Sequence, residues 1–245
     1  MILLKRNANE TNRDYALRVI KENIINLEIQ PGSLLGEQQV ADQLGLSRTP
    51  VHEAFLELSK TRIVEIYPQR GSFVSLIDMS LVEEAAFMRR TLEIAILEQV
   101  CETATEKDLK KLEENVSLQK FYIQNPSPTK LMELDDAFHY YLYEICDKTQ
   151  VYAIVHSMGI HLNRLRSMSL HSVRDLKIVE DHENIVEAVR ARDKEQVKTV
   201  LTKHLSRYKF DKDELFKAYP DYFVSTGDST AKRVADPHQR GKSLI

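Results

Sequence analysis

Cysteine, glycine and proline are scarce in this chain of 245 residues. The two cysteines, Cys101 and Cys146, lie far apart and form no CxxC motif, so we expect two buried free thiols in a reducing compartment rather than a disulfide. Only seven glycines and seven prolines interrupt a sequence rich in leucine, glutamate and lysine. This composition favours a mainly helical fold.

Long hydrophobic runs are also missing from the sequence. No stretch approaches the roughly 18 consecutive apolar residues of a membrane-spanning helix, and the apolar run at the start is too short for a signal peptide. We therefore expect a cytoplasmic protein without a membrane partner. The formal net charge of −3 gives no sign of a nucleic-acid partner, although a small basic face can be hidden in the total.

The N-terminal segment 1–78 combines helical and strand periodicity. Residues 13–28, 36–45 and 46–62 have apolar side chains at helical spacing, and a short turn joins the last two segments. Residues 63–78 alternate apolar and polar side chains around the segment 68–71, which predicts a β-hairpin. This order predicts a winged helix-turn-helix whose second helix enters the DNA major groove. The alternative is a small helical domain with a solvated charged face.

The start of that second helix carries the candidate DNA contacts. Ser47 is suited to cap the helix, and Arg48 after it can form paired hydrogen bonds with guanine or with a phosphate. Thr49 suits a phosphate oxygen or a thymine methyl group. In the hairpin, Gly71 permits a tight turn, and Arg70 beside it can reach a phosphate or the minor groove.

The segment LLGEQQVADQLGLSRTPVHEAFLELSKTRIVEIYPQRGSFV resembles the DNA-binding domain of the GntR family of bacterial transcription regulators. The match runs through Pro31–Gly32, Leu35, Glu37, Ala41, Leu44–Gly45, the run from Ser47 to Val51, Glu53–Ala54, Leu58 and Arg70–Gly71. The resemblance implies DNA contacts from Gln38, Ser47, Arg48, Thr49, His52, Arg70 and Gly71. Members of the family commonly carry arginine at the position of His52 and often at that of Gln38. We therefore expect weaker DNA binding, or a changed base preference, than is typical of the family.

The sequence after residue 78 has a different character. From Met79 to about Tyr222 it keeps helical periodicity with short breaks and shows no strand pattern. This predicts an antiparallel bundle of six or seven helices within a mainly α fold. We therefore expect a winged helix-turn-helix domain at 1–78, a helical domain at 79–223 and a disordered polar tail at 224–245. The resemblance to GntR regulators implies that the helical domain binds the effector and forms the dimer.

Asp135 and His139 lie four residues apart in the aromatic-rich stretch LDDAFHYYLYE. On a helix this spacing places both side chains on one face, about 6 Å apart along the axis, where both can reach one ion. Asp136 points about 100° away, so we do not count it as a ligand. An ordinary amphipathic helix without a metal explains the same pattern.

Two later histidines can complete such a site. His182 precedes Asp193 by the same number of positions as His204 follows it. If two helices meet near Asp193 as an antiparallel hairpin, equal arms bring both histidines to the same level. With Asp135 and His139 they would form a donor set that suits a divalent ion such as Zn²⁺, Ni²⁺ or Mn²⁺. Alternatively, His182 packs or caps a helix and His204 is exposed.

The helical part is similar to the all-helical effector domain of the FadR subgroup of GntR regulators, through MRRTLEIAILEQV, DDAFHYYLYE and EDHENIVEAVRARD. Metal-binding members use an Asp-x₃-His pair and two later histidines, which correspond to Asp135, His139, His182 and His204. The resemblance implies a small carboxylate effector at the metal, helped by arginines of the first long helix. Arg89 and Arg90 fill that segment, and Arg164 and Arg166 are further candidates.

The resemblance also implies a homodimer that places two recognition helices in successive major grooves of double-stranded operator DNA. Loss of operator affinity on effector binding is the common behaviour of the family. The favoured function is therefore a ligand-responsive repressor rather than an enzyme. Two alternatives remain. One is a metal-dependent, hydrolase-like enzyme that uses the Asp/His₃ site to activate water. The other is a metal ion that has a purely structural role or is itself the signal.

Overall fold

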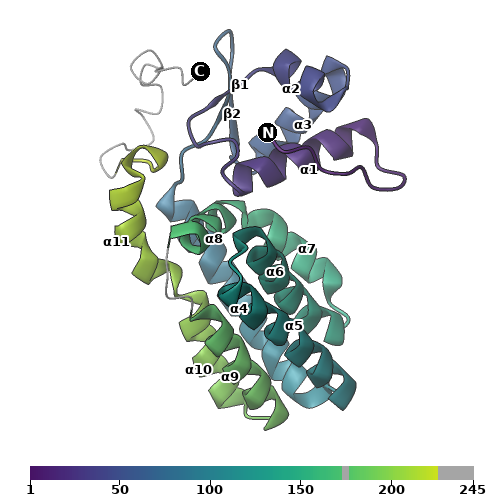
Figure 1. The fold of residues 1–245 in the computed structure, drawn as a ribbon, viewed down its shortest axis with the longest axis vertical. Helices are drawn as coiled ribbons and strands as arrows, with labels where there is room; N and C mark the ends of the chain where they lie inside the picture. Colours follow the sequence, from purple (N-terminus) through teal and green to yellow (C-terminus); the bar gives the residue numbers. More distant parts are fainter. Residues whose placement is uncertain (173–176, 226–245) are drawn as a thin grey trace.

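The computed structural model describes residues 1–172 and 177–225. From residue 226 onward, the tail expected from the sequence lies outside the described residues. In Figure 1 a small unit that contains the sheet lies at the top, and a long helical bundle lies below it. The name "winged unit" is used below for the segment 1–78, and "bundle" for the helices that follow.

The winged unit contains three helices and a three-stranded antiparallel sheet with the strand order β1-β3-β2. Its elements are α1 (Asn12–Ile25), β1 (Leu34–Leu35), α2 (Glu37–Leu44), α3 (Arg48–Lys60), β2 (Val64–Tyr67) and β3 (Gly71–Val74). The hairpin pairs Val64 with Val74 and Tyr67 with Gly71. The predicted helices and hairpin are confirmed, whereas β1 is not foreseen because two residues carry no periodicity.

Two glycines with positive φ shape the turns of the winged unit. Gly45 has a φ of 65° and ends α2 in the left-handed conformation, where its neighbour Leu46 donates its N–H to the Ala41 carbonyl at 2.9 Å. Gly71 begins β3 with a φ of 103°, and a Cβ at this position would lie 3.1 Å from Cδ1 of Leu34. Glycine is favoured at both positions because other residues rarely adopt these conformations.

Eight helices follow in the part of the chain that the structure describes, where the sequence predicts six or seven. They are α4 (Met79–Thr103), α5 (Glu106–Gln124), α6 (Pro128–Ile145), α7 (Thr149–Met158), α8 (Ile160–Ser172), α9 (Ile178–Arg190), α10 (Lys194–Leu205) and α11 (Tyr208–Ala218), before the 3₁₀ helix η1 (Pro220–Tyr222). The higher number arises from breaks at Gly159 and at Ser206–Arg207, which are too short to interrupt the periodicity. The predicted fold class, mainly α with a winged helix-turn-helix and a helical bundle, is confirmed.

Helix α8 lies at the junction of the winged unit and the bundle, in contact with α1 as well as with α4, α6 and α11. Met132 and Ile160 of the bundle belong to the same buried apolar cluster as the helices of the winged unit. Arg164 of α8 is fully buried, and its Nη1 donates to the Ser75 carbonyl at 2.6 Å. This bond ties α8 to the segment that leaves β3.

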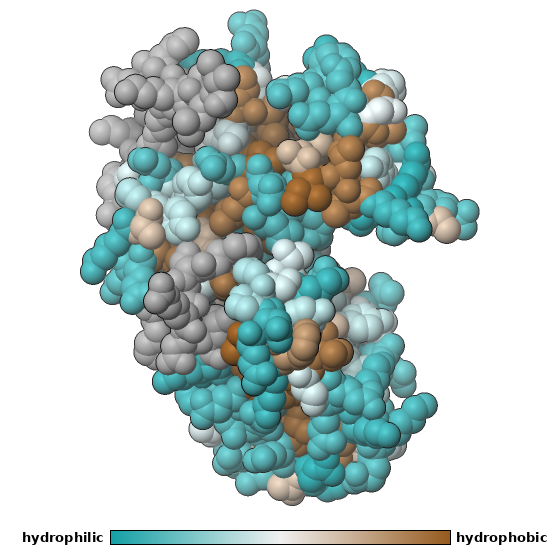
Figure 2. All heavy atoms as spheres, viewed as in Figure 1, coloured by the Kyte–Doolittle hydropathy of each residue, from teal (hydrophilic) through white to brown (hydrophobic). Residues whose placement is uncertain are grey.

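The apolar side chains gather in three buried clusters: one inside the bundle, one in the winged unit and one where α4, α8 and α11 meet. In the view of Figure 2 the outer surface of the bundle is mostly hydrophilic. None of the described helices is both long and apolar enough to cross a membrane.

Candidate metal centre

Asp135, His139, His182 and His204 converge in the interior of the bundle, and all four are buried. Asp135 and His139 come from α6, His182 from α9 and His204 from α10. The ligand atoms of the four residues all lie within 4.8 Å of one another. His204 Nε2 is 3.1 Å from His139 Nε2 and 3.3 Å from His182 Nε2. The four residues are called the Asp/His₃ cluster below.

A chain of hydrogen bonds determines which nitrogen of His182 carries the proton. The Leu134 carbonyl can only accept, and Asn115 Nδ2 donates to it at 3.1 Å. Asn115 Oδ1 therefore accepts from Gln119 Nε2 at 2.6 Å, which leaves Gln119 Oε1 to accept from His182 Nδ1 at 2.9 Å. Because His182 donates through Nδ1, its Nε2 points a lone pair into the cluster.

The other two histidines also turn Nδ1 away from the cluster and toward carboxylates. His139 Nδ1 lies 2.8 Å from Glu93 Oε2, and His204 Nδ1 lies 3.6 Å from Asp181 Oδ2. Both nitrogens therefore face a carboxylate oxygen, His139 at hydrogen-bonding distance and His204 at a longer one. Carboxylates behind histidines orient the rings and raise the basicity of the opposite nitrogen.

Charge pairing keeps the buried carboxyl groups ionised. Burial alone would raise the pKa of Glu93, but the charge of Arg89 lowers it to about 2. Burial also opposes ionisation of Asp135, but Arg166 beside it holds the pKa of that carboxyl well below its usual range. For His182, burial lowers the pKa well below 6.5, so the ring is neutral.

The donor atoms fit a divalent cation. Three imidazoles that aim their Nε2 lone pairs at one place repel one another unless positive charge lies between them. Asp135 adds a negative charge, with Oδ1 3.5 Å from His182 Nε2. Three imidazole nitrogens and one carboxylate oxygen are a common donor set for divalent transition metals. The buried cluster could therefore hold a metal ion.

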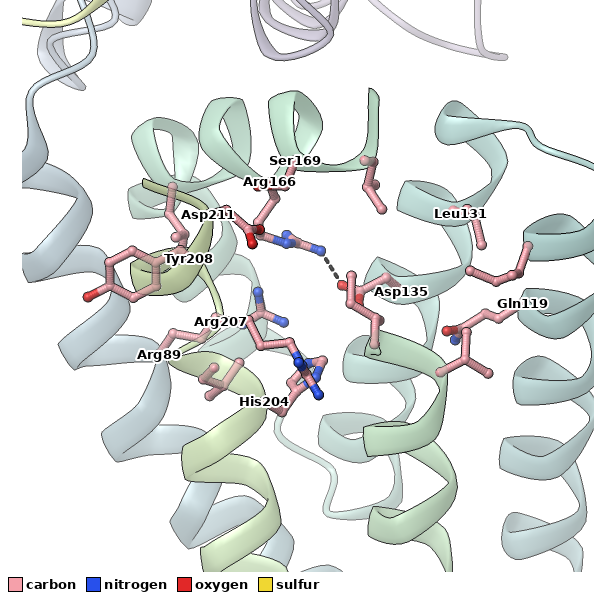
Figure 3. A pocket seen from close by; sticks show the side chains of 16 residues that line it. Arg89, Gln119, Leu131, Asp135, Arg166, Ser169, His204, Arg207, Tyr208 and Asp211 are labelled. Carbon is pink, nitrogen blue, oxygen red and sulfur yellow. Dashed lines mark hydrogen bonds and ion pairs between the residues drawn. The ribbon is translucent and has the colours of Figure 1, made fainter. Parts of the chain in front are cut away.

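A cavity opens beside the cluster and is lined by two of its members, Asp135 and His204 (Figure 3). It offers about 70 Å³ to the centres of water-sized molecules, whereas one water needs about 10–15 Å³ by this measure. The cavity is therefore large enough for a small organic molecule. Arg89, Arg166 and Arg207 also line the cavity, and Figure 3 shows their side chains around one space.

Of the four arginines considered for effector binding, the structure brings Arg89 and Arg166 to the cavity. Arg166 Nη2 donates to Asp136 at 3.0 Å and also to Asp135. Arg90 does not line the cavity, because adjacent residues on a helix point about 100° apart. Arg164 is committed to the junction with the winged unit, so its guanidinium faces away from the cavity.

Sequence reasoning does not identify the side chains that stand behind the histidines. Asn115 and Gln119 are four residues apart on α5, but a polar pair at this spacing is typical of any exposed helix face. Asp181 precedes His182 directly, and Arg207 follows His204 by three residues, so proximity in the sequence is the only signal for these two.

The seven residues predicted to contact DNA are exposed on the winged unit: Gln38, Ser47, Arg48, Thr49, His52, Arg70 and Gly71. Glu37 of α2 contacts two of them at the start of α3. Its Oε2 lies 2.5 Å from Arg48 Nε, and its Oε1 lies 2.8 Å from His52 Nδ1. Gln38 Nε2 donates to Asp42 Oδ1 at 2.8 Å. Glu37 therefore holds a guanidinium and an imidazole side by side.

Comparison with known proteins assigns both parts of the chain to families. Residues 15–74 match the gntR family of bacterial regulatory proteins, and residues 84–207 match the FCD domain. The HTH-type transcriptional repressor RspR of Escherichia coli K12 is 30% identical over 207 residues, which cover 84% of this chain and 91% of RspR. An HTH-type transcriptional regulator of Streptomyces ambofaciens is 29% identical over 229 residues, which cover 93% of this chain and 95% of that protein.

Solved structures share the fold. E. coli McbR/YncC matches with a TM-score of 0.72 and 18% identity, over 85% of this chain and 99% of that protein. A transcriptional regulator from Rhodococcus sp. RHA1 matches with a TM-score of 0.68 and 21% identity, over 84% of this chain and 98% of that protein. The families matched and the relatives compared are transcription regulators, not enzymes. The chain therefore belongs to the GntR family of bacterial transcription regulators, with a helical FCD domain after its winged helix-turn-helix.

Proposed function

We propose that this protein is a repressor whose operator affinity responds to a small organic acid, bound beside a divalent metal ion in the bundle. The observation that carries the proposal is the convergence of three imidazole Nε2 atoms and a buried carboxylate next to a cavity lined by arginines. A merely structural histidine cluster would not need a ligand-sized space beside it.

The metal ion would be held by Asp135, His139, His182 and His204. When bound, it would supply a Lewis-acid centre that can accept an oxygen of the effector. Zn²⁺, Ni²⁺ and Mn²⁺ suit this donor set. Arg89, which is buried at the cavity wall, would pair with the carboxylate of the effector.

The winged unit would bind operator DNA through the first turns of α3. Arg48 and His52 are exposed there, and their shared contact with Glu37 orients both toward the same side. A homodimer would place two α3 helices in successive major grooves. A repressing role is supported by the relative RspR, which is named a transcriptional repressor.

Helix α8 would couple the two sites. It carries Arg166, which lines the cavity, and Arg164, whose guanidinium holds the Ser75 carbonyl at the exit from β3. A ligand that displaces α8 would therefore change the placement of the winged unit. In energetic terms this is a coupling free energy between effector and operator binding.

The test is an operator-binding titration of the full chain, with and without metal, against a panel of organic acids. At least one acid should change operator affinity in the metal-loaded protein and have no effect after chelation. Asp135→Ala should abolish the response and the bound metal, whereas Asp136→Ala, which removes the neighbouring partner of Arg166, should keep both. The proposal fails if chelated protein stays folded and still responds to the acid.

A further inference from the structure

The cavity beside the Asp/His₃ cluster is charged at one end and apolar at the other. Arg89, Asp135 and His204 belong to the charged end. The other end is called the apolar end below and consists of Leu131, Leu170, Ile178 and Val179. These residues belong to the last turn of α8 and the first turns of α6 and α9. A ligand that fills this cavity must therefore meet both kinds of surface.

The helices themselves set the order of the two ends. Leu131 precedes Asp135 by four residues on α6, and Ile178 precedes His182 by four residues on α9. Each apolar side chain thus lies one helical turn, about 6 Å, from a member of the cluster. A ligand with its carboxylate at the cluster would direct the rest of its body along this apolar wall.

The charged end has one guanidinium that is ready for a ligand. Among the described residues, Arg89 donates through Nε to Glu93 at 2.7 Å and makes no hydrogen bond through Nη1 or Nη2. Arg166 is engaged through both Nη atoms, and Arg207 is engaged through Nε with Asp181 and through Nη2 with a backbone carbonyl. One free guanidinium fork matches one carboxylate.

Apart from its arginines, Asp135 and His204, the described lining has seven apolar residues and only four polar ones, which are Gln119, Ser169, Tyr208 and Asp211. The amide of Gln119 is occupied on both sides, by His182 and by Asn115. Asp211 lies on the lining and would repel a second carboxylate. Hydroxyl groups placed against Leu131 or the other apolar residues would lose their hydrogen bonds to water without replacement.

We infer that the effector is a monocarboxylic acid with a hydrocarbon body, and that polyhydroxylated and dicarboxylic acids of the same length are poor ligands. This inference rests on the proposed effector site and specifies the class of molecule that the site takes. The carboxylate meets Arg89 and the cluster, and the hydrocarbon body covers the apolar end.

The test measures Kd by titration calorimetry on the full chain, loaded in parallel with Zn²⁺ or Mn²⁺. The ligands are butyrate, hexanoate and octanoate, with adipate and gluconate as six-carbon acids that add a carboxylate or hydroxyls. Affinity should rise about fourfold with each methylene that is buried, so hexanoate should bind roughly fifteenfold more tightly than butyrate. Adipate and gluconate should bind at least tenfold more weakly than hexanoate.

Two substitutions test the contribution of each end of the cavity to ligand affinity. Ile178→Asn should reduce the gain in ligand affinity per methylene to less than twofold, while the amount of metal bound per chain stays constant. The matched control is Ile154→Asn, at an isoleucine of α7 that is 61% exposed, and it should leave the gain unchanged. Arg89→Lys should weaken all the monocarboxylates by a similar factor and leave the chain-length dependence intact.

Three results would contradict the inference. If gluconate or adipate binds more tightly than hexanoate, the class of effector is wrong but the effector site stands. If no acid of either kind binds the metal-loaded protein, the proposed organic-acid site fails and the inference fails with it. An Ile178→Asn variant that keeps the full chain-length dependence would also contradict the assigned role of the apolar end.

Discussion

His182 and His204 face each other across the hairpin of α9 and α10, with their Nε2 atoms 3.3 Å apart. Asp193 lies midway between them in the sequence. The carboxylate of Asp193 caps α10 by accepting from the Gln196 N–H at 2.9 Å. A shift of one residue in either arm would turn a histidine by about 100°, so the position of this helix cap decides whether the cluster forms.

Gln119→Leu should weaken metal binding about 10- to 100-fold, because it removes the acceptor that orients His182. A competition titration against a chromophoric chelator measures the metal affinity of the variant. Gln124→Leu is the matched control, since Gln124 is an exposed glutamine at the end of the same helix. Equal affinities for the two variants would show that the chain of amides has no influence on the metal.

Arg164→Met should lower the free energy of unfolding by about 2–4 kcal/mol, because it leaves the buried Ser75 carbonyl and the half-buried Leu76 carbonyl without their donor. Urea denaturation measures the change. Arg190→Met is the control, because the ion pairs of Arg190 are exposed and should contribute less than about 1 kcal/mol. A loss for Arg164→Met no larger than that of the control would contradict the linking role of Arg164.

His161 should make stability fall in acid. Its Nδ1 accepts from Arg164 at 2.8 Å, and its Nε2 lies 3.3 Å from the Thr61 carbonyl. Burial, and then the charge of Arg164, lower the pKa of His161 from 6.5 to about 3. As the pH falls, the imidazole of residue 161 is therefore protonated in the unfolded chain before it is protonated in the folded protein. The contribution of neutral His161 to the free energy of unfolding is complete above pH 6.5 and declines as the pH falls toward 3.

The comparison with His161→Gln isolates this contribution. The unfolding free energy of the natural protein minus that of the variant should be constant above pH 7. It should fall by up to about 1.4 kcal/mol per pH unit between pH 6 and pH 4. Denaturation curves at several pH values provide the measurement, and a difference that does not vary with pH would refute the assignment.

His52→Arg should strengthen operator binding and steepen its salt dependence. Arginine adds a fixed charge beside Arg48 at the start of α3, and one further phosphate contact increases the slope of log K against log salt by about one. Gln150→Arg adds the same charge at an exposed position at the start of α7, at the opposite end of α6 from Met132, which packs against the winged unit, and it should not change the slope. Unchanged affinity and slope for His52→Arg would mean that position 52 does not approach DNA.

The residues of the candidate metal centre differ in how far they can be predicted from the sequence. Asp135 and His139 share a helix, so their i, i+4 spacing is a local property that requires no knowledge of packing. Placing His182 and His204 beside them needs the additional assumption of a hairpin at Asp193, and the structure brings all four together. Gln119 could not be found in this way, because its contact with His182 spans 63 residues.

Periodicity, capping and turn residues act over a few positions, and for this reason the winged helix-turn-helix and the helical bundle can be predicted from the sequence alone. The complete set of four cluster residues followed from the resemblance to the FadR subgroup. Only the tertiary structure reveals that Arg89 and Arg166 reach the cavity, whereas Arg164 donates to the Ser75 carbonyl in the segment that leaves β3. The physical reason is that the surroundings of a side chain depend on how distant helices pack against its own helix. The apolar end of the cavity has the same origin, because helix ends far apart in the chain form it.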